Sequence, residues 1–178
     1  MTSEFVHLHN HSDYSLLDGA QKIDQLVNTI DDLNMDAVAL TEHGNMFSVL
    51  PYYKQAKKAG IKPIIGCEIY VAVGSRFEKK TRSDGGWGNN HLILLAQNFT
   101  GYKNLMKLVT AGYLEGFYYR PRIDMDLLRE YSDGLICMSA CLKGVVPEKM
   151  LKGDYEGARK EALLFSEIFQ DRYYLEIQ

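Results

Sequence analysis

Short apolar runs alternate with segments of helical spacing along most of the chain, which limits the folds open to it. In Lys22–Asn34, apolar residues at positions 23, 26, 27, 30 and 33 have the spacing of an amphipathic helix. Ile61–Val73 is rich in β-branched residues, as strands are. The predicted order is strand Phe5–His9, helix Lys22–Asn34, strand Asp36–Leu40, helix Met46–Ala59, strand Ile61–Val73, strand Leu92–Ala96, helix Tyr102–Leu114, strand Leu135–Ser139, helix Tyr155–Phe169 and strand Tyr173–Ile177.

This alternation predicts an α/β fold with parallel strands. The sequence contains no glycine-rich dinucleotide turn, which favours a TIM-like barrel over a doubly wound sheet. Periodicity does not decide whether a sheet closes, so an open sheet remains an alternative. No repeat or linker divides the chain, so we expect residues 1–178 to form one domain. Its last unit is expected to be incomplete because the chain ends on a strand.

Composition narrows the class of protein. A hydrophobic fraction of 46% is enough for a full-sized core. No apolar run is long enough to span a bilayer, and Met1–Ser12 lacks the features of a secretory signal, so we expect a cytoplasmic location. The odd cysteine count, without a C-x-x-C pair, argues against a disulfide framework or zinc ribbon. A net charge of −3 does not predict nucleic-acid binding, but it permits local basic patches and a site that collects cations.

The histidines are concentrated at the start of the chain. Three of the five lie within Val6–His11, and none follows His91. In a strand, residues two apart project from one face, so His9 and His11 can converge on one cation. His7, two residues before His9, would project from the same face. The alternative is a polar edge strand with chance histidines, but parallel barrels place their ligands at strand ends, which favours a metal site.

Two further candidates follow the same logic. His43 comes at the end of the second predicted strand, before Gly44, which permits a tight turn. Glu42 points the other way and is expected to support the site or cap a helix. Glu68 lies inside an apolar strand, where a carboxylate is costly unless it is paired or metal-bound. A salt bridge is the alternative, but a carboxylate can bridge two cations, as two-metal phosphoryl hydrolysis requires.

Spacing alone leaves other candidates open. His91 precedes a strand, whereas barrel ligands are expected at the far end, so a packing role is equally plausible. Cys141 follows a strand and could be a zinc ligand, although buried cysteines usually only pack. Cys137, inside the strand, is the better packing candidate. For Asp18, spacing favours a turn or helix cap.

Two basic segments could hold phosphates. Arg76–Asn90 is glycine-rich with four basic side chains, but such runs usually face water, and that reading is preferred. Tyr118–Arg122 interleaves aromatic residues with Arg120 and Arg122, as single-strand binders often do; an interdomain packing role is equally open. Asp124–Asp126 is not taken as a polymerase aspartate pair, because it begins a predicted helix that it would cap.

With these residues assembled, the chain resembles the polymerase-and-histidinol-phosphatase (PHP) domain family, specifically the branch at the N-terminus of bacterial DNA polymerase III α subunits of the DnaE type. The resemblance covers essentially the whole chain and rests on six specific segments. They are FVHLHNHSDYSLLDGA (5–20), LTEHGN (40–45), GIKPIIGCEIY (60–70), NFTGYKN (98–104), LEGFYYRPRID (114–124) and GLICMSACL (134–142).

The resemblance implies a distorted seven-stranded (β/α)7 TIM-like barrel, C-terminally incomplete here, holding up to three divalent metals, usually zinc or manganese; iron is also compatible with such ligands. It implies that Glu68 bridges metals, and it raises Asp18, His91 and Cys141 above what spacing indicates. His7 is not a ligand in this scheme. The implied metal ligands are His9, His11, Asp18, His43, Glu68, His91 and Cys141.

Two departures from the family pattern are expected to matter. The second motif usually reads Thr-Asp-His, whereas Glu42 stands here, which affects only the surroundings of the ligands. The family also closes its site with a later Asp-x-His pair, and no histidine follows His91. Two of nine expected ligands are therefore missing, so we interpret the chain as a fragment of a larger protein.

The resemblance implies part of a DNA-directed DNA polymerase carrying a metal-dependent phosphoesterase. The expected reaction is 3′–5′ exonuclease proofreading by two-metal water activation, through metals on His9, His11, His43 and Glu68. One alternative is a non-catalytic, metal-stabilised module that supports the polymerase and binds a separate proofreading subunit; another is a stand-alone histidinol-phosphate-type phosphatase. Polymerase-specific segments argue against the latter, and the presence of every checkable ligand favours catalysis. Expected partners are the DNA primer end, the remaining polymerase domains and replisome subunits, without a membrane.

Overall fold

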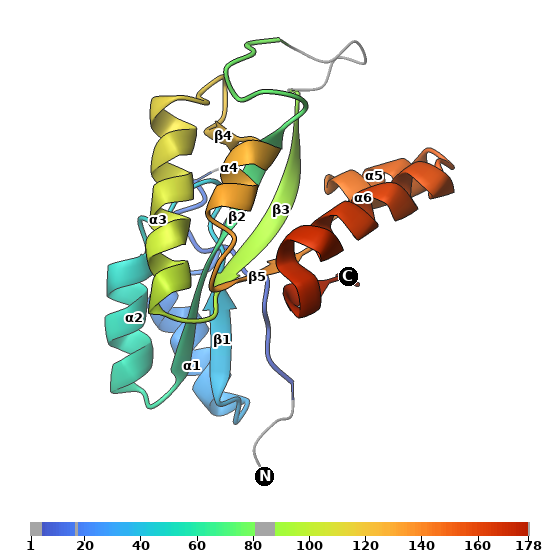
Figure 1. Ribbon diagram of the computed structural model, residues 1–178. Coiled ribbons are helices and arrows are strands. Elements are labelled where there is room, and N and C mark those ends of the chain that lie inside the picture. Colours follow the sequence, from blue (N-terminus) through green and yellow to red (C-terminus); the bar gives the residue numbers. More distant parts are fainter. Residues whose placement is uncertain (1–4, 17, 81–87, 178) are drawn as a thin grey trace.

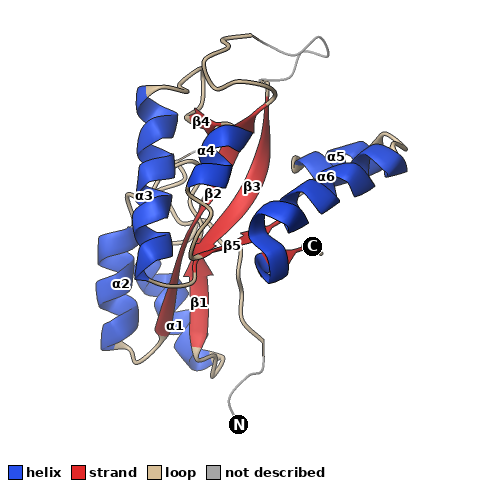
Figure 2. Ribbon diagram, in the orientation of Figure 1, coloured by secondary structure: helices blue, strands red, loops and turns tan. Residues whose placement is uncertain are grey.

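The computed structural model describes residues 5–16, 18–80 and 88–177. Within them, helices and strands form a mixed α/β fold (Figure 1; Figure 2). The strands build one sheet in the order β1-β2-β3-β5-β6, with β4 paired to β2. The elements are α1 (Ile23–Asp32), β1 (Ala37–Leu40), α2 (Val49–Lys58), β2 (Lys62–Ala72), β3 (Asn89–Ala96), α3 (Phe99–Leu114), β4 (Arg122–Ile123), α4 (Met125–Glu130), β5 (Leu135–Met138), α5 (Val145–Leu151), α6 (Tyr155–Phe169), a 3₁₀ turn (Gln170–Arg172) and β6 (Tyr173–Tyr174).

The sheet of the described residues is open, so the predicted seven-stranded barrel is not confirmed. The expectation of parallel strands is wrong at β3, which runs antiparallel to both β2 and β5. β2 and β3 are consecutive in the chain, and the described part of their connection, residues 73–80 and 88, contains no helix, in keeping with an antiparallel pair. Its register pairs Tyr70 with His91 and Glu68 with Ile93, which brings the start of β3 to the C-terminal end of β2.

The N-terminal segment is extended, but it is not the strand predicted at Phe5–His9. It lies along β1, where the Ala39 amide donates to the His7 carbonyl and the Thr41 amide to the Asn10 carbonyl. The Asn10 side chain donates to the Ala39 carbonyl, and the Asn10 amide donates to the Thr41 hydroxyl. Side-chain bonds therefore occupy groups that a regular ladder would use, which explains why the two backbone bonds do not extend into a strand pair.

The two faces of the sheet carry different cores. Because side chains alternate along a strand, Cys67, Ile69, Leu92 and Leu94 point to one face, where α3, α4 and α6 cover them. The opposite face carries a smaller apolar cluster and, on β2 and β3, Glu68, Tyr70 and His91. The members of that smaller cluster are Ala39, Ile93, Leu95, Met138 and Ala140.

The helices largely follow the predicted pattern. α6 has the predicted bounds, and α1 buries Ile23, Leu26, Val27 and Ile30 of its expected stripe against β1 and α2. Leu33, the last expected member, lies beyond the helix and is 52% exposed. Asp124 caps α4 by accepting from the Leu127 amide, as expected. β4 and α5 were not predicted. The strand expected at Tyr173–Ile177 is only Tyr173–Tyr174, since the Glu176 amide bonds the Ser139 hydroxyl instead of a backbone partner. No described helix is long and apolar enough to cross a membrane.

Candidate metal centre

The centre forms where the end of β1, the middle of β2 and the start of β3 meet. Beyond β1, His43 pairs in parallel with Glu68, and the Gly44 amide donates to the Glu68 carbonyl. Gly44 has φ +63°, and a Cβ there would lie 2.8 Å from the ring of Tyr70, so this turn requires glycine. The backbone therefore carries His43 to the same rim as Glu68 and His91.

The Glu68 carboxylate lies at the middle of the centre and is 1% exposed. Its Oε2 lies 2.8 Å from His9 Nε2 and 3.4 Å from His11 Nε2. His9 and His11 are called the first histidine pair below. Their Nε2 atoms are 3.1 Å apart, so both rings present a nitrogen to one carboxylate oxygen.

The other oxygen of Glu68 faces a different pair. Its Oε1 lies 2.9 Å from His43 Nδ1 and also contacts His91 Nδ1. His43 and His91 are called the second histidine pair. Each pair forms, with Glu68, a group whose ligand atoms lie within 4.8 Å of one another, close enough to hold a metal ion. One carboxylate is thus shared between two candidate ion positions.

Asp18 and Cys141 reach the second pair from two loops. Asp18 Oδ2 lies 3.1 Å from His43 Nε2, although its side chain is 63% exposed. Cys141 Sγ is 3.8 Å from His91 Nδ1. The His91 amide donates to the Lys143 carbonyl, and this backbone contact holds the Cys141 loop against the start of β3.

Glu42 lies beneath the centre and is not among its candidate ligands. It is 1% exposed and accepts hydrogen bonds from the Ser12 amide and from the hydroxyls of Ser12 and Ser15. The Ser15 hydroxyl also accepts from the His43 amide. Glu42 therefore connects the loop that leads to Asp18 with the turn that carries His43.

Charge explains how these groups coexist in a buried site. Burial alone favours the neutral imidazole of His9, but hydrogen bonds to Glu176 and Glu68 outweigh it and raise the His9 pKa to about 9. For His91, burial is likewise outweighed, by Cys141 and Glu68, and the pKa is raised to about 9. Burial opposes ionisation of Glu68, yet its four histidine partners hold its pKa well below the ordinary value.

The donor set fits divalent metals. In the neutral His9 imidazole that donates from Nδ1 to Glu176, Nε2 has no proton and faces Glu68 Oε2 at 2.8 Å. Two acceptors at this distance require a positive charge between them, either a proton or a metal ion. Nitrogen ligands about 2.0–2.1 Å from a tetrahedral zinc lie roughly 3.3 Å from each other, close to the separation of the first pair.

Comparisons with known proteins show the family of the chain. The PHP domain model matches residues 7–178. The chain belongs to the PHP domain family. It is 56% identical to the DNA polymerase III subunit alpha of Borreliella burgdorferi over 99% of its own length and 15% of that protein. It is 49% identical to the Treponema pallidum subunit, over 98% of the chain and 15% of that protein. The chain thus spans about 15% of the length of these curated relatives.

A solved structure from Bacteroides vulgatus, described as a two-domain protein containing a predicted PHP-like metal-dependent phosphoesterase, is also similar to this PHP domain. The likeness has a TM-score of 0.44 and 19% identity, over 75% of the chain and 33% of that structure.

Sequence reasoning missed Glu176, which supports the first pair of the PHP domain. Its Oε1 lies 2.6 Å from His9 Nδ1, on the side of the ring away from Glu68. A carboxylate behind a ligating histidine fixes the tautomer and orientation of the ring. The signal was present in the sequence, because Tyr-Leu-Glu-Ile at 174–177 places a carboxylate in an apolar run, as Cys-Glu-Ile does around Glu68.

The two arginines predicted to bind substrate differ in the PHP domain. Arg122 is 1% exposed, and its guanidinium donates to the carbonyls of Gly116, Arg76 and Glu78. These bonds occupy the guanidinium inside the protein, so Arg122 holds its segment in place and does not reach a substrate. Arg120 is partly exposed and lies over the Tyr70 ring, 5.6 Å from its centroid.

The basic loop predicted at Arg76–Asn90 is described only in part, and Arg82 lies outside the described residues. The Arg76 guanidinium is bound by Asp124 and Glu115, 3.0 and 2.6 Å away, so it is not offered to a phosphate. Lys79 and Lys80 are exposed, as expected for a solvated loop. Cys137 is fully buried in the core, as expected for packing.

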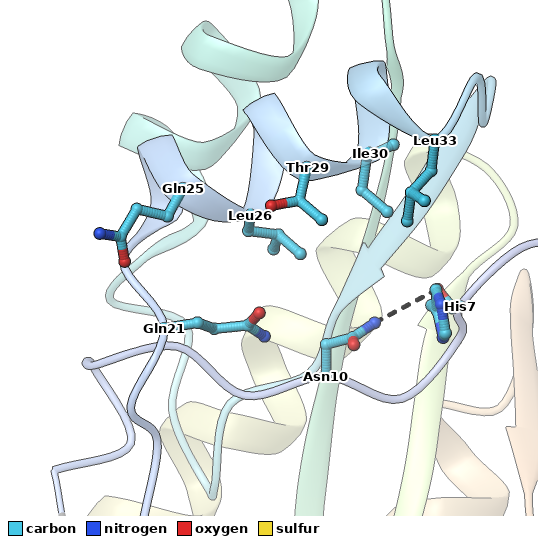
Figure 3. A pocket seen from close by; sticks show the side chains of 8 residues that line it. All are labelled: His7, Asn10, Gln21, Gln25, Leu26, Thr29, Ile30 and Leu33. Carbon is cyan, nitrogen blue, oxygen red and sulfur yellow. Dashed lines mark hydrogen bonds between the residues drawn. The ribbon is translucent and has the colours of Figure 1, made fainter.

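His7 lies outside the metal centre. It lines a groove of about 490 Å³ between the N-terminal segment and α1. Figure 3 shows His7 and Asn10 facing Leu26, Ile30 and other side chains of α1 across this groove. His9 and His11 are not among the residues that line this groove.

Proposed function

We propose that this chain is the PHP domain of a DNA polymerase III α subunit and acts as a metal-dependent 3′–5′ exonuclease on the primer end. The similarity to two such subunits supports the assignment to the polymerase. The observation that carries the chemistry is the shared carboxylate, since Glu68 offers one oxygen to each histidine pair. A carboxylate shared in this way can hold two ions close together, as in the two-metal sites that hydrolyse phosphodiesters.

The residues of the chain have distinct roles in this proposal. The first pair would hold one ion and the second pair another, with Glu68 shared by both. Cys141 would add a ligand to the second ion, and Asp18, on the other nitrogen of His43, would orient that ring. When bound, such ions polarise a phosphodiester and lower the pKa of a water. Arg120, fixed over Tyr70, supplies a cation for a phosphate beside the centre. Glu176 orients His9.

Metal identity is proposed on ligand chemistry. Imidazole, carboxylate and a partly exposed thiol suit zinc, manganese or iron. The family pattern leads us to propose up to three ions, with two further ligands supplied by an Asp-x-His pair outside these 178 residues. We further propose contacts with DNA, with the other polymerase domains and with replisome subunits.

The test uses the whole natural protein that contains this sequence, with metal content verified by elemental analysis. We expect it to shorten a 3′-labelled primer in manganese, and we expect Glu68→Gln to abolish shortening while primer extension continues. If the metal-loaded protein leaves the primer intact, the metal-stabilised structural module is the correct function. The isolated chain should be weakly active or inactive, and robust turnover by it would contradict the proposal of missing ligands.

A further inference from the structure

Three exposed aromatic rings lie in a row beside the metal centre. Phe47, from the turn between β1 and α2, has its ring centroid 6.4 Å from that of Tyr113 on α3. Tyr113 in turn stacks on Phe117 at 6.2 Å. The three residues are 66%, 38% and 49% exposed, and we call them the aromatic strip. Contiguous exposed apolar groups on a globular protein commonly mark a binding surface.

One end of the aromatic strip is fixed to the second histidine pair. Phe47 follows His43 by four residues, and Asn45 between them is 5% exposed. The Asn45 side chain donates to the His43 carbonyl at 3.1 Å and accepts from the Phe47 amide at 3.1 Å. The ligand and the first ring are therefore held in one turn.

Pro121 connects the rest of the aromatic strip to the same turn. A Cβ on Gly44 would lie 2.9 Å from Pro121 Cγ, and a Cβ on Gly112 would lie 3.3 Å from the Pro121 backbone. The turn after His43, the Pro121 segment and α3 are thus in close contact. The aromatic strip and the metal centre are consequently carried by segments that contact one another.

A cation lies between the aromatic strip and the centre. Arg120 precedes Pro121, and its guanidinium lies over Tyr70, whose ring contacts His91 at 5.1 Å and His43 at 6.5 Å. Tyr119, before it, is a non-glycine residue at φ +57°, a conformation that must be maintained by its surroundings. Three residues later, the buried Arg122 anchors the same segment through contacts with three carbonyls.

We infer that the aromatic strip binds the unpaired bases of single-stranded DNA and leads a 3′ end to the metal centre, with Arg120 on a phosphate. The inference rests on the proposed function, because it takes DNA as the substrate. Base stacking on aromatic side chains next to a cation is how single strands are held without sequence preference, and paired bases cannot use it. The net charge of −3 offers no general attraction for DNA, so local contacts must provide it.

The experiment measures contact independently of cleavage. The whole natural protein, treated with EDTA, is irradiated with an oligothymidylate carrying 5-iododeoxyuridine near its 3′ end, and crosslinked peptides are mapped by mass spectrometry. Crosslinks are expected in the peptides that contain Phe47 and Phe117. Phe47→Leu and Phe117→Leu keep apolar bulk but remove the rings, and each should lower the yield on the order of tenfold. Tyr113→Phe keeps its ring and should behave as wild type.

Phe99→Leu is the matched control, because Phe99 is also exposed, at 68%, but lies at the other end of α3. The inference is overturned if crosslinks map elsewhere, or if Phe47→Leu and Phe117→Leu crosslink as Phe99→Leu does. If these variants instead lower the melting temperature of the whole protein with unchanged crosslinks, the aromatic strip docks another domain and the inference also fails. Strip-specific crosslinks without primer shortening support the inference and reject the exonuclease; shortening without such crosslinks does the reverse.

Discussion

The two histidine pairs share Glu68 but differ in what stands behind them. Behind the first pair, His9 Nδ1 is bound by Glu176, whose side chain is 10% exposed. Behind the second pair, His43 Nε2 is bound by Asp18, whose side chain is 63% exposed. A buried carboxylate holds a ring more firmly than a solvated one, because water competes for the latter. The first pair should therefore be the better ordered and tighter ion position, and the second the more accessible one.

Removing the shared carboxylate should have the largest effect, because it should weaken both ion positions and remove the difference between them. In Glu68→Gln, both pairs lose the charged oxygen that they face, so we expect metal affinity to fall by more than about a hundredfold at both positions. Equilibrium dialysis followed by elemental analysis measures this loss. Glu78→Gln, at a carboxylate outside the centre, is the control. Retention of two ions by Glu68→Gln would show that the carboxylate is not the bridge.

Single histidine substitutions should separate the two positions. His11→Asn is expected to remove the ion of the first pair and His91→Asn that of the second, each lowering the metal content by about one ion per chain. Because the first position is expected to be the tighter, His11→Asn should remove the ion that resists chelation longest. Timed release to a chromogenic chelator distinguishes the two variants. Identical release kinetics would contradict the proposed asymmetry.

The supporting carboxylates should have smaller and unequal effects. Glu176→Gln removes the buried partner of His9, and we expect about 10–100-fold weaker binding at the first position. Asp18→Asn should cost less at the second, since Asp18 is largely exposed. Calorimetric titration with zinc measures both, with Glu78→Gln again as the control. A larger loss in Asp18→Asn than in Glu176→Gln would reverse the order of the two positions.

The pH dependence should involve both pairs. The pKa values of His9 and His91 are raised from 6.5 to about 9, so their contribution to stability is fully present below pH 6.5 and lost as pH rises through 9. The Glu68 pKa is lowered from 4.5, so its contribution is present above pH 4.5 and lost on further acidification. The metal-free protein should be most stable between these values.

Urea unfolding in EDTA from pH 5.5 to 9.5 checks this window. The free energy of unfolding should fall with rising pH, whereas zinc affinity should rise over the same range, because both imidazoles must lose a proton to bind metal. In His9→Asn the fall should be shallower. A flat profile in the wild type would argue against the ion pairs around Glu68.

Much of the fold could be predicted because helices leave a strong periodic signal. α1 and α6 carry apolar stripes whose spacing only a helix satisfies, whereas β4, with two residues, is too short for any pattern. Strand direction left no signal either. Nothing in the apolar run of β3 tells whether it runs along β2 or against it, and this ambiguity caused both the parallel-sheet error and the doubt over His91.

The site was predictable where local geometry decides it. His9 and His11 converge because they are two apart in an extended segment, and Glu68 was conspicuous as a carboxylate in an apolar strand. Asp18 and Cys141 depend on loop paths that spacing does not encode, so only the family resemblance indicated them. Glu176 and the inward turn of Arg122 depend on contacts between distant segments, which no local pattern reveals.

The hairpin register of β2 and β3 has a consequence for how this domain can change over evolution. Tyr70 is paired with His91 by the ladder itself, so the position of His91 does not depend on the residues that join the two strands. Changes in the length of that connection can therefore leave the ligand in place. A ligand fixed by sheet register is insulated from a neighbouring loop, so the length of the loop and the chemistry of the site can vary separately.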